Sequence, residues 1–102
     1  SSEIFMAEKL KVIAEQLEKR LSRNNLAGKT VTLKIKYSDF TQQTRSKTLP
    51  YFIASKSLLF EMAKELLYQE RMKNSVRLLG ISVTNLNTDV KKTVVVQLKF
   101  DF

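Results

Sequence analysis

The chain has 102 residues, of which 18 are lysine or arginine and 10 are aspartate or glutamate, so its formal net charge is +8. A chain of this length forms one domain with a modest core, and its charge favours a polyanionic partner, nucleic acid first. It contains no cysteine and no histidine, which excludes disulfides and thiolate chemistry and removes the commonest metal ligand and general base.

The first helix is predicted within residues 1–23. Apolar residues recur there every three or four positions, while charged residues fill the other faces, as in an amphipathic helix. The apolar positions are Met6, Leu10, Ile13, Leu17 and Leu21. Asn24, Asn25 and Gly28 follow, and such turn-prone residues end helices.

Two strands are predicted next. In residues 30–37, TVTLKIKY, apolar and polar residues alternate, so Lys34 and Lys36 lie on the face opposite the apolar side chains. Residues 40–50 form a polar second strand that ends at Pro50 and carries Arg45 and Lys47 on one face. The pair is expected to form a hairpin with a basic exposed side.

A second helix and a third strand complete the pattern. Residues 55–72 contain a helical apolar stripe, with Ser55 or Ser57 as the N-cap. Residues 75–86 form a strand whose apolar residues change parity between Leu78 and Ile81, which predicts a β-bulge near Gly80.

This order of elements predicts an α+β fold with two helices on one face of an antiparallel sheet. The other face stays open, and we expect Lys34, Lys36, Arg45 and Lys47 to point from it. The excess charge is concentrated there, because residues 29–50 contain five basic residues and one acidic residue.

No catalytic or metal site is predicted. The ten carboxylates have no spacing that brings two of them to one ion, and the two glycines form no glycine-rich phosphate loop. No apolar run approaches the roughly 20 residues of a membrane span, and no signal leader is recognisable. We therefore expect a soluble cytoplasmic protein with no membrane partner.

The basic face predicts sequence-independent binding to phosphates. Alternate strand residues lie about 6.6–6.8 Å apart, and neighbouring hydroxyl groups add hydrogen-bond donors. Tyr37 falls on the apolar side, so the exposed side chains include no aromatic ring on which bases could stack. Binding to a nucleic-acid duplex is therefore favoured over binding to a single strand. The alternatives are an RNA-binding module, a protein-interaction domain that uses the apolar tail, and a basic edge that only prevents aggregation.

The run KTVTLKIKYSDFTQQTRSKTLP, followed by a helix and then VRLLGISVTNL, resembles the little finger domain of Y-family translesion DNA polymerases, especially the bacterial DNA polymerase IV branch. The resemblance implies a strand-helix-strand-strand-helix-strand fold whose sheet grips the phosphates of a primer-template duplex in the major groove. By position, Arg45, Lys47 and Arg77 correspond to the phosphate-binding residues, with Lys34 and Lys36 as contributors.

The resemblance also implies that this chain is a noncatalytic part of an error-prone DNA polymerase. The carboxylates that bind magnesium ions would belong to other domains of the parent enzyme, so no cofactor is expected in this chain. The little finger domain is predicted over residues 1–92, and a C-terminal tail over residues 93–102.

The tail resembles the ligands of the bacterial sliding clamp, which have the form Gln-Leu-x-Leu-x-Leu. The corresponding residues are Gln97, Leu98, Phe100 and Phe102, with Phe100 in place of the usual leucine. In the family a strand precedes the first helix, whereas this chain begins at the helix, so one edge of the sheet is expected to be vacant. Residues 93–100 are predicted to cover it, either within one chain or in a strand-exchanged dimer.

Overall fold

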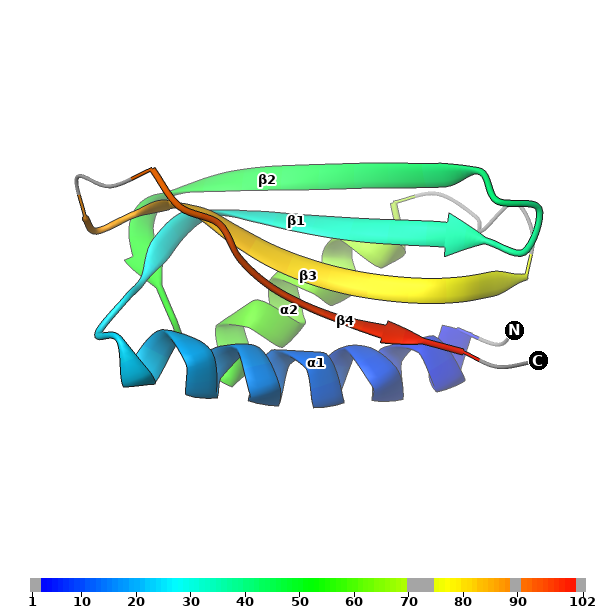
Figure 1. Ribbon diagram of the computed structural model, residues 1–102, viewed down its shortest axis with the longest axis horizontal. Helices are drawn as coiled ribbons and strands as arrows, with labels where there is room; N and C mark the ends of the chain where they lie inside the picture. The colour runs from blue at the N-terminus through cyan, green and yellow to red at the C-terminus, as the bar shows by residue number, and fades with distance from the viewer. Residues whose placement is uncertain (1–2, 70–74, 89–90, 101–102) are drawn as a thin grey trace.

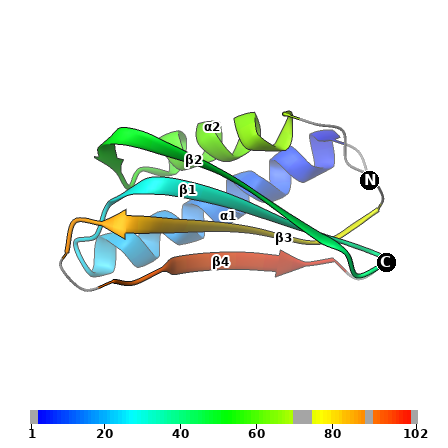
Figure 2. The same ribbon diagram turned by 90° about the horizontal axis from the view of Figure 1, so that it is seen from above.

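The computed structural model describes residues 3–69, 75–88 and 91–100. In chain order its elements are α1 (Glu3–Arg23), β1 (Gly28–Tyr37), β2 (Gln42–Ile53), α2 (Lys56–Leu67), β3 (Val76–Leu86) and β4 (Val94–Lys99). The strands form an antiparallel sheet in the order β2-β1-β3-β4. Both helices cover the same face of this sheet (Figures 1 and 2), which confirms the predicted α+β fold.

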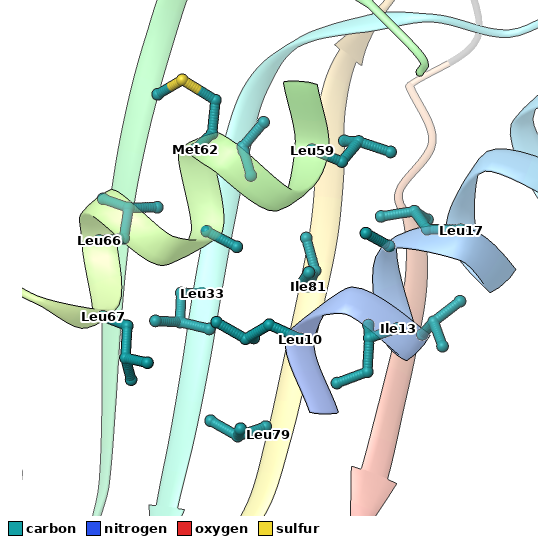
Figure 3. Close-up of a cluster of buried hydrophobic side chains, with 14 of the residues drawn as sticks. Leu10, Ile13, Leu17, Leu33, Leu59, Met62, Leu66, Leu67, Leu79 and Ile81 are labelled. Carbon is teal, nitrogen blue, oxygen red and sulfur yellow. The ribbon is translucent and has the colours of Figure 1, made fainter. Parts of the chain in front are cut away.

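The core lies between the helices and the sheet. The helix α1 packs against β3 and β4, α2 packs over β1 and β2, and the helices also touch each other. Their apolar stripes meet the buried side chains of β1 and β3 in one continuous cluster (Figure 3). The predicted helix stripes are confirmed, since Leu10, Ile13 and Leu66 are fully buried.

The helix α2 begins as predicted and ends earlier. The hydroxyl oxygen of Ser55 accepts a hydrogen bond from the Leu58 amide at 3.3 Å and so caps the first turn. The helix ends at Leu67 rather than at residue 72. The last predicted helical residues, 70–72, lie outside the described part of the chain.

The hairpin of β1 and β2 differs from the prediction at Pro50. The strand β2 continues through this proline to Ile53. The residue is tolerated because β2 is an edge strand and because the ladder with β1 is irregular between Gly28 and Thr30.

Gly28 lies at a close approach between β1 and β3. A Cβ atom there would overlap the side chain of Val83 and lie 2.7 Å from the carbonyl oxygen of Thr84. Only glycine fits this position without a shift of β3 relative to β1.

The bulge in β3 is displaced from the predicted place. Tyr37 pairs with Val76 while Lys36 pairs with Leu78, so Arg77 is the extra residue. The register then runs unbroken past Gly80, and the prediction of a bulge there is wrong. The change of parity in the sequence does correspond to a bulge, but the extra residue is Arg77, three residues before Gly80.

The C-terminal segment forms the fourth strand, which confirms the predicted covering of the sheet edge. Strand β4 pairs antiparallel with β3 of the same chain. Val96 faces the core, and the ring of Phe100 lies 5.7 Å from that of Phe5 on α1. Arg20 of α1 donates a hydrogen bond of 2.7 Å to the Val95 carbonyl. Neither described helix is long and apolar enough to cross a membrane.

Candidate nucleic-acid interface

The face of the sheet that turns away from the helices is defined by strand alternation. Val31, Leu33 and Ile35 of β1 are buried under the helices, so the residues between them point the other way. Residues paired directly across strands share a face. The open face therefore comprises Thr30, Thr32, Lys34, Lys36, Gln42, Thr44, Ser46, Thr48, Leu78, Gly80, Ser82, Thr84, Val95, Gln97 and Lys99.

One half of the open face is cationic. Lys34 and Lys36 follow each other on β1 at about 6.6–6.8 Å. Lys36 and Lys99 both pair with Leu78, so their Cα atoms are two strands apart, about 10 Å. None of the strand residues on this face is a carboxylate, so no strand residue of the face neutralises the lysines.

The other half is lined by hydroxyl groups that bond to one another. The hydroxyl oxygens of Thr30 and Thr48 lie 2.9 Å apart, and those of Thr32 and Ser46 lie 2.8 Å apart. The amide nitrogen of Asn85 also donates to Thr30 at 2.7 Å. These pairs form a polar ladder across β1 and β2 beside the lysines.

Gly80 lies in the cationic half, between Lys34 on β1 and Gln97 on β4. It is buried by its neighbours, and a Cβ atom there would lie 3.1 Å from the Cβ atom of Gln97. A glycine at this position therefore allows Gln97 of β4 to pack tightly beside β3.

An exposed aromatic ring borders the cationic half, and sequence analysis missed it. Phe40 lies in the turn between β1 and β2 with a φ of 70° and 68% of its surface exposed. The Arg77 guanidinium carbon lies 4.6 Å from the ring centroid, and the Lys36 ammonium lies 6.0 Å from it. These cation–π contacts hold Arg77, the extra residue of the bulge in β3, at the same end of the sheet as Lys36. Tyr37 is buried, as predicted.

The predicted placement of Arg45 is wrong. Arg45 pairs with Leu33, so it lies on the helix side, where only 7% of its surface is exposed. Its Nη1 donates to the carbonyl oxygens of Leu66 and Leu67 at 2.7 and 2.9 Å, and its Nη2 donates to Gln43 Oε1 at 3.1 Å. The last carbonyls of a helix lack partners within the helix and carry partial negative charge. Arg45 thus caps the C-terminus of α2.

The predicted placement of Lys47 on the open face is also wrong. It pairs with Val31 on the helix side, and its Nζ lies 2.8 Å from Glu65 Oε1 on α2. The clue in the sequence is Leu49, which is buried and shares the parity of Arg45 and Lys47. Leu49 is the one apolar residue within residues 41–49, and it identifies the core side of this part of the strand.

The tail residues divide between the two faces of β4. Gln97 points from the open face, whereas Leu98 and Phe100 belong to the helix side and pack against the core. Phe102 lies outside the described residues. Within the described ranges, no three carboxylates lie together as a metal site would require.

These residues form an α+β domain with a helix-covered face and an open face suited to a polyanion. Residues 2–101 match the impB/mucB/samB family C-terminal domain, and the chain belongs to this family. The resemblance to the Y-family little finger domain is thereby confirmed.

Relatives cover nearly the whole chain. It is 42% identical over 97 residues to a DNA polymerase IV of Clostridium perfringens, a match that covers 94% of this chain and 27% of the relative. It is 33% identical over 94 residues to the DNA polymerase IV of Akkermansia muciniphila, covering 91% of this chain and 26% of the relative. The chain thus spans about a quarter of the length of these relatives.

Replacing Arg45 tests its role in the fold. Arg45→Met is expected to lower the free energy of unfolding by about 2 kcal/mol, because it leaves the two helix carbonyls and Gln43 without this donor. Lys47→Met removes a half-exposed ion pair and should cost no more than about 1 kcal/mol. Urea unfolding of both variants measures the difference, and equal losses would contradict the capping role.

Proposed function

We propose that this chain is the DNA-holding domain of a translesion DNA polymerase that works in the bacterial cytoplasm. The proposal starts from the family and from relatives that are DNA polymerases IV. In the parent enzyme, nucleotide transfer would be carried out by other domains, and this domain would keep the primer-template duplex in place during synthesis across damaged bases.

The observation that carries the proposal is the charge of the open face. Lys34, Lys36 and Lys99 share this face, Arg77 stands at its end, and no carboxylate lies among its strand residues. Lysines on alternate strand positions lie about 6.6–6.8 Å apart, which approximates the distance between successive phosphates of a nucleic-acid strand.

We propose that the contacts are to phosphates and that Arg45 and Lys47 support them indirectly. Phosphate contacts fix the position of a protein on DNA and carry no sequence information. Arg45 and Lys47 hold α2 against β2 and so support the sheet from its helix side. Their direct contact with DNA stays a prediction.

Removal of two open-face lysines tests this function. Lys34→Gln with Lys36→Gln should weaken binding to every duplex sequence about equally and reduce the salt dependence of log K by about 1.8, or 0.9 per lost phosphate contact. Fluorescence anisotropy with blunt duplexes at several salt concentrations measures both quantities.

A matched control removes the same charge elsewhere. Lys11 and Lys56 line a groove between the two helices together with Glu15 and Glu61. Lys11→Gln with Lys56→Gln should leave duplex binding nearly unchanged. If both double variants lose the same affinity, net charge alone explains binding. A wild-type preference for single-stranded RNA would instead support the RNA-binding alternative.

We further propose that the C-terminal residues tether the polymerase to the sliding clamp. Gln97, Leu98, Phe100 and Phe102 supply the polar and apolar anchors of an extended peptide ligand. Leu98 and Phe100 pack on the helix side in β4, so they reach a clamp pocket only when β4 leaves β3. Strand exchange between two copies would use the same edge of β3, and a monomeric mass in solution would exclude it.

A disulfide across β3 and β4 tests whether the tail must leave the sheet. The Phe100 amide donates to the Arg77 carbonyl at 2.7 Å, so by alternation Ser82 and Val95 form a non-hydrogen-bonded pair with close side chains. Because the chain has no other cysteine, Ser82→Cys with Val95→Cys forms a unique bond on oxidation.

The oxidised variant should lose clamp binding and regain it on reduction, as measured by surface plasmon resonance on an immobilised bacterial clamp. Ser82→Cys alone is the control for the oxidant. Equal binding by the oxidised and reduced forms would show that the tail docks without leaving β3. Equal binding by a chain that lacks residues 97–102 would refute the tether itself.

A further inference from the structure

A second cationic cluster lies at the end of the domain away from Lys36 and Arg77. Arg20 and Arg23 come from the last turn of α1, and Lys92 directly precedes the segment that enters β4 (Figure 1). They line a groove of about 360 Å³, completed by Asn24, Thr93, Val94 and Val95. We name it the end groove, and none of its lining residues is a carboxylate.

The end groove is held in shape by its surroundings. Arg20 is fixed by its hydrogen bond to the Val95 carbonyl. Asn87 ties the end of β3 to the loop after α1, because its backbone amide donates to the Ala27 carbonyl at 2.9 Å and its side-chain oxygen accepts from the Ala27 amide at 3.1 Å. These bonds join the loop after α1 to the end of β3.

The requirements of the fold explain only part of this charge. Basic residues in the last turn of a helix are stabilised by its dipole, which accounts for Arg20 and Arg23. Lys92 comes from another segment and brings further positive charge to the end groove, which costs repulsion. Within the described residues, Arg23 and Lys92 form no ion pair. A bound anion would relieve this repulsion.

The end groove is continuous with the open face. A second groove of about 620 Å³, lined by Thr84, Asn85, Leu86, Thr88, Lys91, Lys92 and Thr93, shares Lys92 and Thr93 with it. Thr84 belongs to the open face, four residues along β3 from Gly80, which is about 13–14 Å. A polar and basic path thus runs from the lysines along the sheet and over its end toward α1.

Stiffness decides which form of nucleic acid can follow this path. The domain is only 21 Å across its two short axes, so the path turns from one face to the other within a short distance. Duplex DNA has a persistence length of about 150 base pairs and resists such a bend, whereas a single strand tracks a basic groove readily. We propose that the end groove binds the phosphates of a single-stranded extension of the DNA whose duplex lies on the open face.

This inference rests on the proposed duplex binding and adds the place where a single strand leaves it. The experiment compares a blunt duplex with the same duplex carrying an eight-nucleotide extension at either the 5′ or the 3′ end. Wild-type protein should bind one extended form more tightly, by a factor on the order of ten at 0.1 M salt for two phosphate contacts.

Arg23→Gln with Lys92→Gln should remove this gain and leave the affinity for blunt duplex unchanged. Arg20 is kept because it holds β4. The control is again Lys11→Gln with Lys56→Gln, which should keep the gain. An extension that adds no affinity to wild type, or a gain that survives in the Arg23 and Lys92 variant, would overturn the inference. Failure to bind the blunt duplex would instead refute the proposed function.

Discussion

The structure depends on the register of β1, the strand that pairs with β2 on one side and with β3 on the other. Its alternate residues are buried under the helices, and the residues between them carry the lysines of the open face. A shift of one residue would exchange the two faces, burying Lys34 and Lys36 under α1 and α2. Gly28 restricts such a shift, because the close approach of β3 leaves no room for a side chain there.

The same register divides the cations of residues 29–50 into two groups with different tasks. Lys34 and Lys36 remain on the open face, where no strand carboxylate neutralises them. Arg45 and Lys47 turn toward α2, where one caps the helix and the other pairs with Glu65. Arg45, which is one position from the residue that pairs with Lys34, thus stabilises the fold, and a count of positive charge by segment overstates the binding surface.

Much of the fold could be predicted because its patterns are local. The helix stripes, the alternation of β1 and the Ser55 cap each depend on residues close in sequence. The face of β2 was harder, because only Leu49 marks its core side among polar residues. The bulge at Arg77 and the ring of Phe40 near two cations depend on how β3 meets β1, which no local pattern encodes. The end groove joins residues about 70 positions apart, so it required the three-dimensional structure.

The most direct test of the account is the change in backbone amide chemical shifts of the labelled protein when a blunt duplex is added. The account predicts the largest changes along the open face, at Thr32, Lys34, Gly80 and Ser82, with little change along α2. Changes concentrated on α2, with β1 unaffected, would contradict the claim that DNA lies on the face of the sheet opposite the helices.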